Sequence, residues 1–303
     1  MLRIFLLTFG VFCGSTAVIM IKESTLHPSV LAAYRLLLAT LFLSPLFLIQ
    51  LRQYRNEYSW RHVQRSLLPA LTLALHFISW AQGAQWTHAA NASLIVNMVP
   101  VVMPFLLYFS VREMVTKGEI IGTAVSLAGV CLLTMSDFSL SRQHLLGDIT
   151  CFVSMLLFAH YMAQGRANRD FPTIWLYLVP LYAMAGVICL VISCFVAEPL
   201  RLYAPREYWL ILGLAVIPTI MGHSILNYSM KHLRGQIVSV FNLCQFLFAG
   251  VLAYLRFGEV PQPIFFGAGA LVVGGALLVI RASSGPHADK KTDLSTLPLE
   301  EAV

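Results

Sequence analysis

Residues 172–196 read PTIWLYLVPLYAMAGVICLVISCFV and contain no charged side chain. A helix needs about 20 apolar residues to cross a hydrocarbon core of about 30 Å, so this stretch is long enough to span a membrane. Nine further stretches have the same character. We place the ten predicted spans at about 2–21, 29–50, 66–84, 90–111, 118–136, 147–165, 172–196, 207–230, 235–257 and 263–280.

The composition agrees with a chain that lies mostly in lipid. Of the 303 residues, 58% are hydrophobic and 11% are charged, against about 45–50% and about 25% in a soluble domain. Lipid offers no hydrogen-bond partner to the backbone, so each stretch is expected to be a helix. The alternating pattern of a membrane β-strand is absent. The predicted fold is an all-α membrane protein with ten transmembrane helices, surrounded by the lipid bilayer.

The basic residues predict how the chain is oriented. If the N-terminus is cytoplasmic, fourteen of the twenty Lys and Arg residues fall in inside gaps and five in outside gaps. This bias predicts that both termini are cytoplasmic. No basic run is interleaved with aromatic residues, so we do not expect nucleic-acid binding. The run from Ile4 to Ile21 is long enough to span, which favours an uncleaved first helix over a signal peptide.

The six cysteines lie inside apolar stretches and form no CxxC pair. They are typical of small apolar residues rather than disulfides or zinc ligands. We therefore expect no metal and no organic cofactor.

Three pairs of matched residues indicate that the chain is an internal duplication. Glu113 matches Glu259 at an offset of 146, His76 matches His223 at 147, and Pro28 matches Pro172 at 144. Each half holds five spans, an odd number, so the halves must insert with opposite topology. We predict one repeat over 1–136, a second over 147–281, and a polar, disordered cytoplasmic tail over 282–303. Inverted repeats favour alternating access; a duplicated scaffold that transports nothing is the alternative.

Polar residues inside the spans are the candidates for lining a cavity, because no Asp or Glu lies in the middle of any span. Several of them follow helical spacing, which places them on one face of a helix. The alternative is that they bond neighbouring helices as structural contacts. The predicted substrate-binding residues are Arg35, His76, Trp80, Asn97, His160, His223, Asn227 and Gln245.

Arg35 is the one charge inside a span. It could bind a carboxylate or phosphate of the substrate, extend to the membrane interface, or pair with Glu23. Pro100 and Pro104 predict an interruption of the fourth span. Small residues predict close packing in the fifth and tenth spans, at the pairs Gly122 with Ser126 and Ala270 with Gly274.

Ordered motifs resemble a known family. The segment PTIMGHSILN at 218–227 is similar to the PTxxGHxxxN segment of EamA-type transporters, in the drug/metabolite transporter superfamily. The run RLLLA at 35–39 and the segment GEVP at 258–261 resemble further landmarks of the family. The ninth span departs from it, because the family usually carries a Glu-Pro pair where this chain has Gln245 and Phe246.

The resemblance implies a ten-helix inverted-repeat carrier in a bacterial inner membrane, with a cavity lined by spans 1, 3, 4, 6, 8 and 9. It implies export of a small metabolite that is amino-acid-like or drug-like. Uptake by the same fold and a non-transporting scaffold or sensor are the alternatives. An intramembrane enzyme is not expected, because HExxH, GxSxG and a paired acid within a span are absent. The expected partners are a small-molecule substrate and lipid, and the chain is expected to be a monomer or homodimer.

Overall fold

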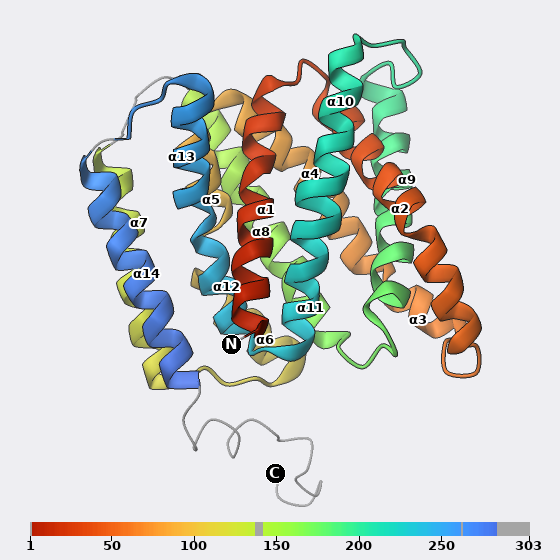
Figure 1. Ribbon diagram of the computed structural model, residues 1–303, viewed down its shortest axis with the longest axis horizontal. Coiled ribbons are helices and arrows are strands. Elements are labelled where there is room, and N and C mark those ends of the chain that lie inside the picture. The colour runs from red at the N-terminus through yellow and green to blue at the C-terminus, as the bar shows by residue number, and fades with distance from the viewer. Residues whose placement is uncertain (1, 137–141, 262, 284–303) are drawn as a thin grey trace, which may run out of the picture.

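The computed structural model describes residues 2–136, 142–261 and 263–283 (Figure 1). Within these ranges the chain is almost entirely helical and contains no strand. The predicted tail lies outside the described residues from position 284 onward. The elements in chain order are α1 (Leu2–Glu23), α2 (Pro28–Gln53), α3 (Trp60–Arg65), α4 (Leu67–Trp86), α5 (Ala89–Val96), η1 (Val99–Val101), α6 (Met103–Val111), α7 (Lys117–Ser136), α8 (Arg142–Ala167), α9 (Ile174–Val196), α10 (Pro205–Leu214), η2 (Ala215–His223), α11 (Ser224–His232), α12 (Gly235–Leu243), α13 (Gln245–Phe257) and α14 (Pro263–Ser283).

Each of the ten predicted stretches is occupied by one helix or by a run of helices. The charge-free stretch at 172–196 forms α9, which begins where the Thr173 side chain accepts a hydrogen bond from the Leu176 N–H at 3.4 Å. By length and hydropathy, eight helices or runs within the described ranges could cross a membrane. The bent pair Asn91–Val101 and Met103–Val111 would make a ninth. The protein is therefore a multi-pass, all-helical membrane protein.

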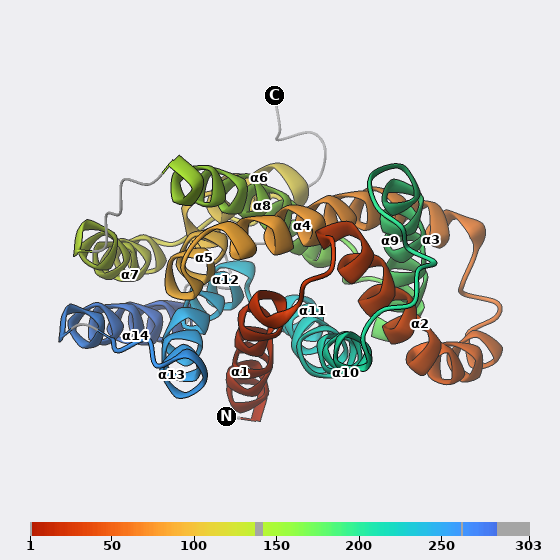
Figure 2. The same ribbon diagram turned by 90° about the horizontal axis from the view of Figure 1, so that it is seen from above.

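Helices from the two halves of the chain pack against one another in pairs. α7 packs along α14, α2 along α9, α4 along α8, and α1 along η2. Figures 1 and 2 place the α7–α14 pair at one edge of the molecule and the α2–α9 pair at the other, with α1, α8, α11 and α12 between them. Because each pair joins an early helix to a late one, the centre of the molecule lies between the two halves.

The start of α1 and the end of α14 lie on the same face of the molecule. Arg3 donates to the backbone oxygen of His232 at 3.4 Å, and Ser283 donates to the Glu119 carboxylate at 2.6 Å. We call this the termini face. The opposite face, where α1 ends at Glu23, we call the far face (Figure 1).

Two of the long helical runs are interrupted near the middle, and a third contains a stretch of π-helix. The pair formed by α5 with η1 and α6 bends by 45°, with Pro100 in η1 and Pro104 in the first turn of α6, so the predicted interruption is confirmed. α12 and α13 meet at Cys244, where no proline signals a break. η2 is a π-helix around Pro218, an irregularity that is frequent at functional sites.

The contact between α7 and α14 depends on small residues, as predicted, but not on the predicted residues of α14. A Cβ at Gly122 would lie 2.7 Å from the backbone oxygen of Gly275, and Ser126 donates to the backbone oxygen of Val272 at 3.2 Å. The prediction for α14 was wrong: Ala270 is exposed, and Gly274 has nothing within 4 Å of its Cβ position. Spacing alone does not fix how a helix is rotated toward its neighbour.

Candidate functional site

A small cavity lies at the centre of the bundle, between the two halves. Its volume is about 30 Å³, which is room for about one or two water molecules. A metabolite therefore fits only after the surrounding helices move apart. The lining residues are Gly10, Gly14, Ala17, Arg35, His76, Trp80, Val96, Asn97, Phe158, Gly222, His223, Leu226, Asn242 and Gln245.

Six of the eight residues predicted for the site line this cavity, and two do not. His160 and Asn227 lie outside its wall. His160 is half-buried on α8 with its Nε2 atom 3.3 Å from the Gln164 amide nitrogen. Asn227 donates to the Tyr161 hydroxyl and, at 2.8 Å, to the backbone oxygen of His223. Asn227 therefore supports the wall one turn behind His223.

Arg35 reaches the cavity from α2. Its Nε atom donates to the Thr219 hydroxyl of η2 at 3.0 Å, and its guanidinium carbon lies 4.0 Å from the centre of the Phe77 ring. Arg35 is only 2% exposed, and its Nη2 atom has no hydrogen-bond partner among the described residues. The expected alternative partner, Glu23, binds Arg206 and Arg256 instead. Arg35 is thus a buried cation beside a cavity.

The matched histidines face one another across the two halves. Their ring centres are 6.3 Å apart. His76 is fixed by Ser154, whose Oγ atom lies 2.8 Å from its Nδ1 atom, and by stacking on Phe158 at 4.6 Å. His223 makes an edge contact with Phe77 at 5.0 Å, while its Nδ1 atom has no partner in the described part of the chain. His76 is therefore held by the protein, and His223 has a ring nitrogen to offer.

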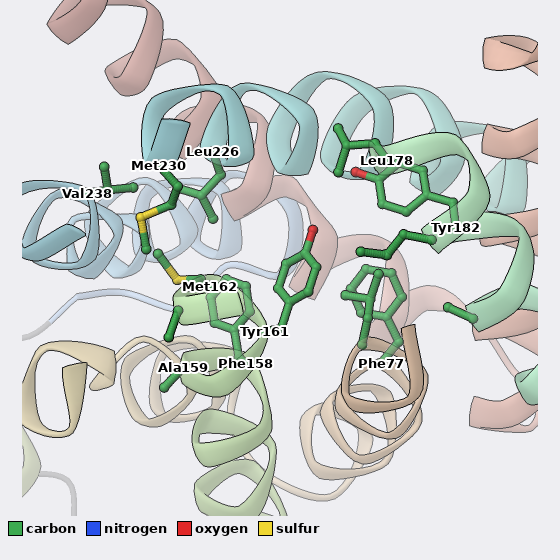
Figure 3. Close-up of a cluster of buried hydrophobic side chains, with 14 of the residues drawn as sticks. Phe77, Phe158, Ala159, Tyr161, Met162, Leu178, Tyr182, Leu226, Met230 and Val238 are labelled. Atoms are coloured by element: carbon green, nitrogen blue, oxygen red, sulfur yellow. The ribbon is translucent and has the colours of Figure 1, made fainter. Parts of the chain in front are cut away.

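Aromatic side chains pack against the two histidines. Figure 3 shows Phe77 projecting from α4, Phe158 and Tyr161 from α8, and Tyr182 from α9 into one cluster of buried side chains. Tyr161 and Tyr182 are fully buried and belong to the main hydrophobic core. These rings keep the polar groups of the cavity in apolar surroundings, which strengthens electrostatic interactions there.

Three side-chain amides form a hydrogen-bonded chain along another wall of the cavity, which we call the amide wall. Gln245 donates to Asn242 at 2.5 Å, Asn242 donates to Asn97 at 2.5 Å, and Asn97 donates to the backbone oxygen of Ser93 at 2.7 Å. Asn97 caps α5 at one helix break, and Asn242 lies in the last turn of α12, next to the other. A Cβ at Gly14 would come within 3.0 Å of the Gln245 amide. At the position of the expected Glu-Pro pair, the chain thus supplies a neutral amide.

Some lining residues were not in the predicted set. Asn242 follows the same helical spacing as Gln245 and could have been included. Gly10, Gly14 and Gly222 are revealed only by packing, because a Cβ at Gly222 would lie 3.0 Å from the Gly14 backbone nitrogen. Among the described residues no group of three or more His, Cys, Asp or Glu side chains could hold a metal ion.

Matched carboxylates stand at the two faces of the bundle. Glu113 follows Arg112, which ends α6 at a φ of 55°, and Glu259 follows Gly258, which ends α13 at a φ of 70°. Both turns use the left-handed conformation that commonly ends a helix. The backbone geometry just before the two carboxylates is therefore similar, and the two differ in their partners.

Glu113 is fully engaged at the termini face. It accepts from Arg166 at 2.8 Å and from the N–H of Gly235, the first residue of α12, at 3.0 Å. Arg166 also donates to the backbone oxygen of Met230 at 3.0 Å. The two charged side chains are only 4% and 9% exposed. This ion pair ties together α6, α8 and the connection from α11 to α12.

The matched groups at the far face are not paired. Lys22 stands 144 residues before Arg166, the offset of the matched prolines. It donates to the backbone oxygens of Thr87 at 2.7 Å and Ala84 at 3.5 Å. Ala84 stands 146 residues before Met230, the offset of the matched glutamates, so we treat these two residues as matched. Within the described ranges, neither Lys22 nor Glu259 forms an ion pair. The far face is joined instead through Glu23 to two arginines that are more than half exposed.

Comparisons with known proteins agree with a transporter. An "Uncharacterized transporter" of Archaeoglobus fulgidus is 27% identical over 286 residues, covering 90% of this chain and 94% of that protein. A "Probable terminal-alkyne amino-acid exporter" of Streptantibioticus cattleyicolor is 24% identical over 218 residues, covering 67% of this chain and 68% of that protein. A solved crystal structure that is 13% identical shares the fold, with a TM-score of 0.75 over 93% of this chain and 98% of that chain.

Two stretches of the sequence, residues 1–135 and 145–281, match the description "EamA-like transporter family". Together they cover most of the chain, and both lie in the helical bundle that surrounds the cavity. The chain therefore belongs to the EamA-like transporter family, and it is a membrane transporter of the drug/metabolite type.

Proposed function

We propose that the protein moves a small organic metabolite across the membrane by alternating access. In this proposal ten spans form two oppositely inserted five-helix repeats, over 1–136 and 147–281, that rock around the central cavity. Residues that match between the halves meet there: Asn97 bonds Asn242 across 145 positions, and His76 faces His223. Contacts between matched residues lie on or near a twofold axis, so they support a pseudo-symmetric arrangement.

The unequal state of the two matched carboxylates is the observation that carries this proposal. Glu113 is locked by Arg166 at the termini face, while Glu259 and Lys22 have no ion pair among the described residues at the far face. An inverted repeat can exchange these two conditions, so that the far pair forms as the near pair breaks. A buried pair costs several kcal/mol to break, whereas exposed pairs such as those of Glu23 contribute about 0–1 kcal/mol. The termini face is thus the more firmly closed.

The charge bias supports an orientation with both termini in the cytoplasm of a bacterial inner membrane. In that orientation the more firmly closed face is cytoplasmic, and the relative named as an exporter supports export as the direction of transport. The relative named as an amino-acid exporter supports an amino-acid-like solute over a drug-like one. Arg35, His76, Trp80, Asn97, His223 and Gln245 would contact the solute directly, and His160 and Asn227 would support them.

The test is a comparison of metabolites in the medium and in cells, with and without the protein. Export predicts that a solute accumulates in the medium, and uptake predicts that one accumulates in cells. Flux should fall in both Glu113→Gln and Glu259→Gln, because each removes one of the two alternating pairs. The control is Asp170→Asn, which removes an exposed ion pair with Arg65. Unchanged metabolites with the intact protein would favour a scaffold or sensor.

A further inference from the structure

Arg35 is a buried cation for which the described part of the chain supplies no counter-charge. The five ion pairs there use the carboxylates of Glu23, Glu113, Glu119 and Asp170, and none of them includes Arg35. A charged side chain inside a membrane is costly and is almost always paired or functional. The Nη2 atom has no partner among the described residues, and Arg35 lines the cavity.

The rest of the lining is neutral. No Asp or Glu is among the cavity residues that the structure describes. Near Arg35, His223 adds a ring nitrogen that has no partner among the described residues. Thr219 accepts a hydrogen bond from Arg35 and donates its own proton to the Leu214 backbone oxygen at 2.7 Å. An organic cation entering the cavity would therefore meet Arg35 and no opposing charge.

The two walls differ in the groups they present. The Arg35 wall offers a guanidinium fork, which suits the planar oxygens of a carboxylate or phosphate. The amide wall of Asn97, Asn242 and Gln245 offers neutral donors and acceptors for hydroxyl, amino or amide groups. Trp80, which is 7% exposed, supplies apolar surface to the same cavity.

Resting on the function proposed above, we propose that the cavity selects small solutes that carry an anionic oxygen group, a carboxylate or a phosphate, which binds to Arg35. The amide wall holds the neutral remainder of the solute, and organic cations are rejected. An amino group on the solute is tolerated but not required, because no carboxylate of the described lining is there to recognise it.

Four probes with one aromatic ring separate these charges. They are 3-phenylpropanoate, phenylalanine, phenyl phosphate and phenethylamine, each tested for thermal stabilisation of the full chain purified in detergent. Stabilisation by 3-phenylpropanoate and phenylalanine assigns a carboxylate site, and stabilisation by phenyl phosphate alone assigns a phosphate site. Phenethylamine should have no effect. Stabilisation by phenethylamine, or by none of the anions, would overturn the proposal.

Variants then locate the anion. Arg35→Gln should weaken binding of the effective anion by about 10–100-fold, since hydrogen bonds to a charged group contribute about 1.5–3 kcal/mol. Arg35→Lys keeps the charge and should retain part of the response. Arg256→Gln, an exposed arginine outside the cavity, is the matched control. If Arg35 is only structural, Arg35→Gln lowers the melting temperature without ligand but leaves the anion response intact, which refutes the assignment.

Flux in proteoliposomes separates this inference from the proposed function. Anion binding that needs Arg35, without flux of any solute, would refute transport and leave the anion site standing. Flux of an organic cation that does not depend on Arg35 would refute the anion site and leave the carrier standing.

Discussion

Replacing Glu113 by Gln should loosen the termini face. The substitution keeps the size of the side chain and removes the charge opposite Arg166, which is 9% exposed and bonds Glu113 at 2.8 Å. Removing one partner of a buried pair costs about 3–5 kcal/mol, because the remaining charge is uncompensated. When the termini face opens, water can solvate Arg166. The uncompensated charge therefore destabilises the closed state more than the open state.

The expected shift in population is large. A tenfold change in an equilibrium corresponds to about 1.4 kcal/mol, so even about 3 kcal/mol favours opening by roughly 100-fold. Met230, which is 1% exposed and accepts from Arg166, is the natural reporter at the termini face. Its match at the far face is Ala84, which is fully buried.

The assay is the labelling of single cysteines, Met230→Cys or Ala84→Cys, by a membrane-impermeant maleimide in a background without the native cysteines. With Glu113→Gln, labelling of position 230 from the termini side should rise by at least about tenfold, and labelling of position 84 should fall. Glu259→Gln is the matched control, because Glu259 has no ion pair to lose within the described residues. Equal labelling at position 230 with and without Glu113→Gln, in protein of unchanged fold, would refute this reasoning.

Three further predictions concern packing and the amide chain. Gly122→Leu should lower the free energy of unfolding by about 1–3 kcal/mol, because its Cβ would lie 2.7 Å from a backbone oxygen of α14. Gly274→Leu is the control and should not lower it, because a Cβ there meets nothing within 4 Å. Equal melting temperatures of the two variants would contradict this prediction. Asn97→Ala and Asn242→Ala should each lower the free energy of unfolding by about 1–3 kcal/mol, measured by chemical unfolding. The double variant should lose less than the sum of the two single losses. Strict additivity would show that the bond between the two side chains contributes nothing. Gly14→Ala should slow flux in proteoliposomes, since its methyl group would lie 3.0 Å from the side-chain amide of Gln245. An unchanged rate would show that the space beside Gln245 does not limit transport.

The sequence could predict much of the site because polar groups are rare inside these spans. Each buried polar residue in a membrane helix needs a reason, so Arg35, His76, Asn97, His223 and Gln245 stood out against apolar neighbours. All five line the cavity. Whether they bind a solute remains a prediction.

Other features could not be predicted from spacing. Periodicity shows which residues share a face, but not toward which neighbour the face turns, and so His160 was placed in the cavity wall and Ala270 in a helix contact. The break at Cys244 has no proline to announce it. The close approach of Gly14 and Gly222 depends on two helices that are far apart in the sequence. Contacts of this kind are set by the packing of the whole bundle.

The bond between Asn97 and Asn242 has a consequence for symmetry itself. Two identical five-helix chains related by a twofold axis would bring one asparagine against its own copy, an isologous contact. A single N–H···O bond within such a pair cannot be symmetric, since one amide donates the hydrogen and the other accepts it. Here Asn242 gives and Asn97 receives, while Asn97 gives its own proton to Ser93. Reversing both amides would produce the twofold-related bond, but it would also break the bond from Gln245 to Asn242, for which Pro100, 145 positions earlier, offers no equivalent, so the two directions of this bond differ in energy.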